Sequence, residues 1–353
     1  MVSCKHKVNI FFFVAYNILE RTPVSFGPGV FLFYNGGNMD EKSFKTLDEL
    51  VDILISRGIE INDASDRAYA KRVLERNGYY NLINGYNKLF LDIPDKSGQP
   101  KYRFGTTMNE IHALFQFDRV LRNIFFRYIL EVETNIKSLI SYYFSEAHGH
   151  KNYLIYSNFN TSLRDSNTKI TSLIADIQRQ LASRSTDPSI AHYLNKHGYI
   201  PLWVLNNILT LGTISKFYSL MLPVERQNIS RHFGIMDNEL ENCLLYISSI
   251  RNFCAHGNRL YCFRTKHPLS NTTYHKDLQI PVNASGEYLY GKRDLFACVI
   301  ALKRLLSHND YKRMTKEIFR DIGTLDHKLS VLTRDDVLNE MGFPNNWRIL
   351  DSL

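Results

Sequence analysis

The residues best equipped for chemistry lie close together in one short stretch of the chain. Arg251 and Asn252 are followed by His256, and Asn258 and Arg259 come directly after a glycine. Arginine is a permanent cation whose planar fork of N–H donors suits phosphate oxygens. Histidine is the side chain best able to move a proton near neutral pH. These residue types are the minimum set for cleaving an RNA phosphodiester without a metal, which makes Arg251 and His256 the catalytic candidates and Asn252, Asn258 and Arg259 the supporting candidates.

The predicted chemistry is a transfer within RNA. His256 takes the proton of a 2′-hydroxyl, which attacks the adjacent phosphate, and Arg251 stabilises the charge of the transition state. DNA lacks the 2′-hydroxyl and is therefore not expected to be a substrate. The competing interpretation is structural: His256 lies at a helix C-terminus, where the dipole favours a positive charge, and the arginines bond acidic neighbours.

A regular helix does not bring the two catalytic candidates together. Residues i and i+5 lie about 140° apart around the axis, because each residue turns the helix by ~100°. Either the helix unwinds near Gly257, or the pair works with its copy from a second subunit in a two-fold homodimer. If the helix persists, Asn252 can fix the tautomer of His256, and Arg259 can add positive charge for a phosphate.

The composition indicates a folded, basic protein. Among 353 residues, 44% are hydrophobic and only 18 are glycine and 10 proline, which is enough for a large core and argues against disorder. The net charge of +8 favours a polyanionic partner such as nucleic acid. Five cysteines without a C-x-x-C pair indicate reduced thiols and a cytoplasmic protein.

The one metal site that the sequence suggests is a zinc site. Cys254, His256 and Cys262 lie close in the chain, but their spacing matches no zinc pattern and a fourth ligand is missing. No glycine-rich phosphate loop and no Ser/His/Asp arrangement is visible. We therefore predict neither a metal ion nor another cofactor.

The first 38 residues differ from the rest of the chain. Lys5 and Lys7 precede a short apolar run, Val8–Leu19, which is too short to span a bilayer. No convincing signal-peptide cleavage site follows it, so no membrane contact is expected. We interpret residues 1–38 as a start extension upstream of a native start at Met39, because Gly-Gly-Asn before a Met can be a bacterial ribosome-binding site read as protein. An unstructured leader is the alternative.

The remaining residues, 39–353, are predicted to form one mostly α domain. Its parts are an N-terminal helical part (39–107), a core (108–322) and a C-terminal tail (323–353). Apolar periodicity over Met108–Ala147 gives the strongest helical signal, with a stripe wide enough for two packed partners. Glu131 and Glu133 on it face different sides, so they are no catalytic pair, although Glu133 can anchor a buried network. Further helices are predicted over about 46–57, 64–76, 162–182, 205–222, 237–249, 293–307 and 311–322, with hairpin pieces at 278–282 and 287–290.

Several segments, in this order, carry a family resemblance. They are NGYYNLINGY (Asn77–Tyr86), FDRVLR with EVETNIK (Phe117–Arg122 and Glu131–Lys137), PLWVLNNILTLGTISKFY (Pro201–Tyr218), IRNFCAHGNRLY (Ile250–Tyr261) and the closing GFPNNW. From about Leu47 to Trp347 the chain resembles the Abi family of bacterial abortive-infection (phage resistance) proteins, of the AbiD/AbiF type. The resemblance does not cover residues 1–38.

The resemblance implies a HEPN-like helical bundle with additional N- and C-terminal helices and a small loop or hairpin insertion after the motif. The family's R-x-x-x-x-H motif falls on Arg251, Asn252 and His256. HEPN proteins are commonly metal-independent endoribonucleases that dimerise to form one composite cleft. The implied protein is a phage-defence toxin acting on RNA as a homodimer, with a phage-encoded trigger or a regulatory RNA or antitoxin as further partner.

Two alternatives stay open, because some HEPN members only bind RNA or other partners. One is a non-catalytic, antitoxin-like module that binds RNA through its basic surface. The other is an interaction scaffold that senses a phage component. The aromatic segment Tyr79–Tyr86 can stack bases, although packing in the core is the favoured interpretation.

Overall fold

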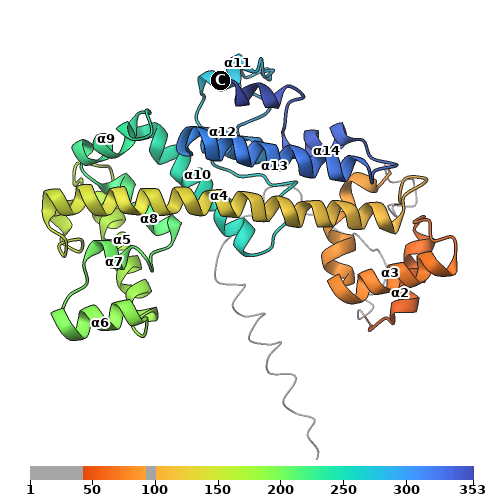
Figure 1. Ribbon diagram of the computed structural model, residues 1–353, viewed down its shortest axis with the longest axis horizontal. Coiled ribbons are helices and arrows are strands. Elements are labelled where there is room, and N and C mark those ends of the chain that lie inside the picture. Colours follow the sequence, from red (N-terminus) through yellow and green to blue (C-terminus); the bar gives the residue numbers. More distant parts are fainter. Residues whose placement is uncertain (1–42, 93–100) are drawn as a thin grey trace, which may run out of the picture. The chain divides into compact units, whose positions relative to one another are not determined.

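The protein is mostly helical over the residues that the structure describes. The computed structural model describes residues 43–92 and 101–353, and Lys45–Leu353 form one compact unit (Figure 1). The mostly α fold expected from the sequence is confirmed, since pairing of β type in these ranges is limited to isolated bridges. The predicted start extension, residues 1–38, lies outside the described residues.

The longest helix, α4 (Met108–His148), is the element on which the others assemble (Figure 1). The hydroxyl of Thr107 accepts the N–H of Glu110 at 3.3 Å and starts the helix, and Gly149 ends it with φ 81°. The helix predicted over residues 108–147 is therefore confirmed. Its wide apolar stripe contacts several partners, among them helices α10 (Asp237–Ala255), α12 (Leu295–Leu305) and α13 (His308–Asp326).

The segment before α4 folds as two helices and two short helical turns. Thr46 starts the first helix through a capping box with Glu49, and Gly78 ends the second with φ 74°, as predicted. The second helix and the first turn both contact α4. The elements are α2 (Leu47–Ser56), α3 (Ala64–Asn77), η1 (Tyr80–Asn84) and η2 (Lys88–Phe90).

Five helices follow α4 before the chain reaches α10. The single helix predicted over Leu205–Leu222 is wrong, because the hydroxyl of Thr210 accepts the N–H of Thr213 and starts a new helix there. Two helices that begin with a proline in their first turn escaped prediction altogether. The elements are η3 (Tyr156–Asn158), α5 (Ser166–Ser183), α6 (Pro188–His197), α7 (Leu202–Leu205), α8 (Leu211–Leu220) and α9 (Pro223–Arg231).

The C-terminal part holds more regular structure than predicted. The expected hairpin after α10 is reduced to one antiparallel bridge between Val282 and Tyr288, next to the short helix α11 (Thr273–Asp277). Residues 323–353, predicted as a tail, contain α14 (Arg334–Met341) and η4 (Trp347–Asp351). Met341 and Trp347 are buried, so these elements belong to the packed structure.

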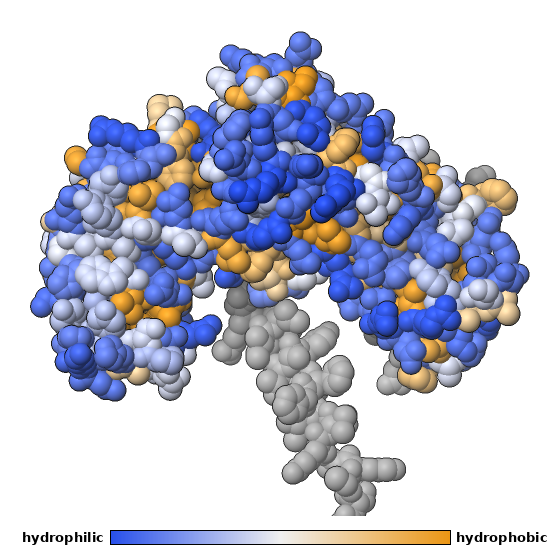
Figure 2. Space-filling model, in the orientation of Figure 1, coloured by the Kyte–Doolittle hydropathy of each residue, from blue (hydrophilic) through white to orange (hydrophobic). Residues whose placement is uncertain are grey.

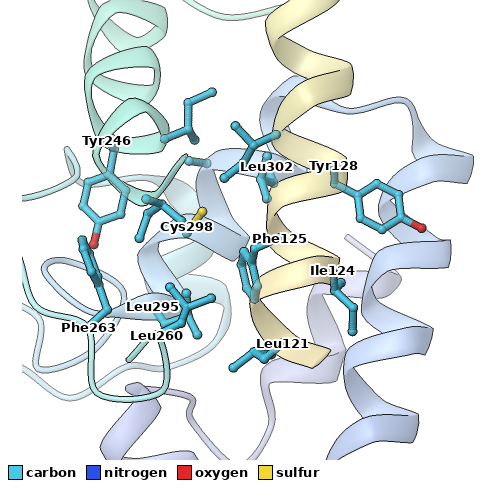
Figure 3. Packing of buried hydrophobic residues seen from close by; sticks show 14 of the residues in the cluster. Leu121, Ile124, Phe125, Tyr128, Tyr246, Leu260, Phe263, Leu295, Cys298 and Leu302 are labelled. Atoms are coloured by element: carbon cyan, nitrogen blue, oxygen red, sulfur yellow. The ribbon is translucent and has the colours of Figure 1, made fainter. Parts of the chain in front are cut away.

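The core between α4, α10 and α12 fixes the position of α10. Phe125 of α4, Cys298 of α12 and Tyr246 of α10 point into one interior (Figure 3). Tyr128 leaves α4 on another side and donates its hydroxyl to Glu317 Oε1 of α13 at 3.0 Å. Each large apolar side chain buried here stabilises the fold by about 1.5–3 kcal/mol. This packing sets where the end of α10 meets α4.

The surface drawn in Figure 2 is mostly hydrophilic, with apolar residues in separate patches. Among the residues that the structure describes, no helix combines the length and the apolar character needed to cross a bilayer.

Candidate functional site

Helix α10 carries Arg251 in its last turns and ends immediately before His256. The N–H of Gly257 donates to the carbonyl of Cys254 at 3.1 Å, and the N–H of Asn258 donates to that of Phe253 at 3.2 Å. Together with φ 68° at Gly257, these bonds form a Schellman motif, which satisfies the last carbonyls of the helix. A helix end near Gly257 was one of the two arrangements predicted, and it is present.

Arg251 lies against α4. Its Nε is 3.6 Å from Oε2 of Glu133, and its guanidinium carbon is 5.7 Å from the ring centre of Phe126. The side chain remains 26% exposed, whereas that of Glu133 is 8% exposed. Neither Arg251 Nε nor Glu133 Oε2 has a hydrogen-bond partner among the described residues, so the ion pair is the polar contact that these two buried atoms share. Arg251 is thus paired on its α4 side and remains partly exposed.

His256 is exposed at the C-cap position of α10, and its ring has no hydrogen bond to the described residues. Its backbone N–H donates to the carbonyl of Asn252 at 3.1 Å. The Asn252 side chain is exposed and does not bond the ring, so the expected tautomer-fixing contact is not present in the single chain. No ion pair or hydrogen bond between described residues joins Arg251 to His256, because the helical backbone persists up to His256 and separates their directions.

The loop after the helix end is held by the buried carboxylate of Asp118, which is not among the predicted site residues. Oδ1 of Asp118 accepts the N–H of Tyr261 at 2.7 Å, and Oδ2 accepts the hydroxyl of Tyr86 at 2.6 Å. Arg122 forms an ion pair with the same carboxylate and donates to the carbonyl of Asn258 at 3.1 Å. Burial raises the pKa of Asp118, and the Arg122 charge opposes that rise.

Arg259 bonds the backbone of a distant segment. Its Nη1 donates to the carbonyls of Asn84 at 3.3 Å and of Gly85 at 3.1 Å. A Cβ on Gly85 would lie 3.4 Å from Cδ of Arg259, so the Arg259 side chain packs directly against this backbone. The arginine therefore ties the η1 segment to the loop, although it was expected to add charge for a phosphate. Asn258, the other supporting candidate, contributes its backbone carbonyl to Arg122.

The aromatic segment before α4 joins the same network. The rings of Tyr86 and Tyr261 stack with centres 5.4 Å apart, and Phe115 meets Tyr86 edge-on at 5.3 Å. Tyr86 is buried, as the favoured packing interpretation requires, whereas Tyr80 is 74% exposed. Three segments far apart in sequence, around Tyr86, Asp118 and Tyr261, thus meet at the end of α10.

A second network links α4 to the turn after α7. The amide nitrogen of Asn206 donates to the carbonyl of Lys137 at 3.0 Å and to Oγ of Ser141 at 2.7 Å. Lys137 in turn pairs with Glu133 at 2.7 Å. The sequence showed Glu133 and Lys137 only as an i,i+4 pair on a helix. Glu133 was expected to be able to anchor a buried network. It does so, because it also pairs with Arg251, which is far away in the sequence.

The two cysteines near the motif are free thiols. Burial raises the pKa of Cys254 to about 12 and that of Cys262 to about 11. Within residues 43–92 and 101–353, no three His, Cys, Asp or Glu side chains cluster in a way that suits a metal ion. Cys254, His256 and Cys262 therefore do not form the zinc ligand set that their spacing raised.

A family model described as Abi-like protein matches residues 72–262, which is more than half of the chain. The matched range begins in α3 and ends at Cys262, so it includes α4, α10 and the loop that follows. No curated protein and no solved structure matches the chain.

Proposed function

The chain belongs to the Abi-like protein family, and on this premise we propose that it cleaves RNA with Arg251 and His256 during abortive infection. Membership in the family supports a role in phage resistance. The ribonuclease activity is the part that we add. We propose that the domain is of HEPN type, that it needs no metal ion, and that the protein acts in the bacterial cytoplasm.

The observation that carries this proposal is the way in which α10 presents the two residues at its C-terminal end. Arg251 contacts Glu133 and Phe126, and 26% of its side chain remains exposed. His256 lies on the helix end with a free ring. A partly fixed cation and an accessible proton carrier are the groups that cleavage through a 2′-hydroxyl requires.

Each residue has a separate role in the proposed reaction. Neutral His256 accepts the proton of the 2′-hydroxyl while that oxygen forms a bond to phosphorus. Arg251 stabilises the extra negative charge on the phosphate oxygens, and the bond to the 5′-oxygen breaks as that oxygen takes up a proton from water. The proton accepted by His256 is then released to solvent. The products are a 2′,3′-cyclic phosphate and a free 5′-hydroxyl, so an all-DNA strand is not a substrate.

The position of the two residues on one helix supports a site built from two copies. Within one chain they point apart, because they are five positions apart on a helix that remains regular up to His256. A two-fold homodimer that sets two α10 ends side by side brings the Arg251 of one copy toward the His256 of the other. We therefore propose a composite cleft in a homodimer.

The test is cleavage of single-stranded RNA by purified protein, with the product ends mapped. Arg251→Ala and His256→Ala should each abolish cleavage and protection against phage while leaving the helical circular dichroism unchanged. Matched controls are Arg313→Ala and His327→Ala, which remove an exposed arginine and an exposed helix-capping histidine of α13. Full cleavage or protection by both site variants would refute the catalytic assignment.

A non-catalytic RNA-binding module is the second candidate. It is favoured by the lack of any contact between Arg251 and His256 in the described chain, and by the net charge of +8. It predicts RNA binding that weakens steeply with salt but yields no cyclic phosphate ends. A regulatory RNA, an antitoxin or a phage component would then be the physiological partner.

A further inference from the structure

A groove runs along the C-terminal half of α4 and begins at the residue that holds Arg251. Its lining positions on α4 repeat every three or four residues from Leu130 to Glu146, so they share one face of the helix. The opposite side comes from Trp203 and from the turn at Asn206. The groove encloses about 940 Å³ and is open to solvent, a size in the upper range of ligand sites.

The far end of this groove is aromatic. Trp203 is 50% exposed and Tyr142 is 61% exposed, although burial of such rings ordinarily adds to stability. The ring centre of Trp203 lies 5.5 Å from that of His150. The chain has two tryptophans, and the other, Trp347, is buried. An indole face left open inside a groove is a surface on which a planar ligand can stack.

The floor between the two ends is polar and fixed. Asn206 is 2% exposed, and its amide nitrogen is bound to Lys137 and Ser141 while its Oδ1 has no partner. The Lys137 ammonium group lines the groove and forms an ion pair with Glu133. The second carboxylate of the lining, Glu146, lies at the aromatic end. The cations nearest to a bound strand are Lys137 on the floor and Arg251, which pairs with Glu133 next to the lining, and the aromatic end offers Trp203 to an uncharged base.

We propose that this groove is a track for single-stranded RNA, with a base stacked on Trp203 and the backbone leading to Arg251. The proposal rests on the proposed function and adds to it a second contact point on the substrate. From Glu133 to Glu146 the helix rises by about 20 Å, at about 1.5 Å per residue. That length corresponds to about six stacked nucleotides at about 3.4 Å each. The stacked base thus lies several nucleotides from the cut.

The test measures binding of a ten-nucleotide 2′-O-methyl oligoadenylate, which cannot be cleaved, to the full chain. Tryptophan fluorescence should change on binding, because Trp203 is the exposed indole and Trp347 is shielded. Trp203→Phe should abolish this change, and Trp203→Ala should raise the Kd by about 5- to 100-fold. Arg251→Ala should raise the Kd of the same oligomer, since the strand reaches both ends. A trinucleotide spans only one end, so its Kd should respond to one of the two substitutions and not to both.

The controls separate the groove from other surfaces. Tyr80→Ala removes an exposed aromatic ring outside the groove and should leave the Kd unchanged. Duplex RNA and heparin should not alter the fluorescence, since neither offers an unpaired base. An unchanged Kd for Trp203→Ala, with circular dichroism confirming its fold, would overturn the proposal, as would a larger effect of Tyr80→Ala.

Failure of the groove and failure of the ribonuclease give different results. If RNA binding depends on Trp203 but the protein never cuts RNA, the proposed cleavage is refuted and the proposed track is supported. If the protein cuts RNA and Trp203→Ala changes neither binding nor cleavage, the track is refuted and the ribonuclease activity is supported.

Discussion

Two buried carboxylates of α4 determine how the end of α10 is held. Asp118 and Glu133 each pair with a cation four residues further along the same helix, and both pairs are visible in the sequence as helix-supporting contacts. Each carboxylate also has a distant partner, the N–H of Tyr261 for Asp118 and the side chain of Arg251 for Glu133. These partners were not predictable, because only the packing of α10 on α4 brings them within reach.

Replacing the second carboxylate tests its role as a positioning residue for Arg251. Glu133→Gln keeps the size of the side chain but removes the charge that balances Lys137 and faces Arg251. We expect kcat for RNA cleavage to fall by about 10- to 100-fold, because a misplaced group loses orientation. KM should change less, since Arg251 itself remains. The free energy of unfolding in urea should fall by about 1–3 kcal/mol.

The matched control is Glu131→Gln, because Glu131 lies two residues earlier on the exposed side of α4. It removes the same charge without touching Arg251, so kcat should stay at the wild-type value. Equal effects of the two substitutions on kcat would show that Glu133 acts only through the net charge of the protein.

At the scale of elements, the sequence predicted helices well where a cap or a glycine marks their ends. Thr46, Gly78 and Gly257 lie where a helix begins or ends, and each is a residue type with a known preference for that place. The single helix over Leu205–Leu222 was wrong because the apolar pattern continues through a turn that only the Thr210 cap interrupts. The site itself was predicted as residues on one helix, but their supports on α4 and η1 depend on tertiary packing.

The helix end at Gly257 can be tested with two glycine substitutions that should change the free energy of unfolding in opposite directions. Gly257 has φ 68° and no atom near the place of a Cβ, so Gly257→Ala adds backbone strain and no clash. We expect the free energy of unfolding to fall by about 1–2 kcal/mol, and cleavage to fall because His256 shifts.

The control is Gly323, which lies inside α13 and has equally open space at the place of a Cβ. Gly323→Ala should raise the free energy of unfolding by about 0.5–1 kcal/mol and leave cleavage unchanged. Thermal or urea unfolding measures both, and destabilisation by both substitutions would contradict this account of the helix end.

At the scale of the whole molecule, the two residues of the proposed site, Arg251 and His256, do not meet within one chain. The core between α4, α10 and α12 holds α10 in one place, so bending the helix to join Arg251 and His256 would disrupt buried packing. In the homodimer that we propose, a second copy would join them without any change within the chain. The proposed unit of function is therefore the homodimer.

Mixing inactive variants distinguishes a shared site from a site within one chain. Arg251→Ala and His256→Ala proteins, co-expressed so that subunits can pair at random, should regain up to roughly a quarter of wild-type cleavage. Half of the dimers are then mixed, and each mixed dimer keeps one intact Arg–His set of two.

The reverse mixture combines wild-type chains with chains carrying both substitutions. If the site is shared, its mixed dimers are inactive, because each set contains a substituted residue. If each chain carries its own site, the mixture of the two single variants stays inactive. In the mixture of wild-type and doubly substituted chains, each mixed dimer then keeps half of the activity of a wild-type dimer, because its wild-type chain has a complete site.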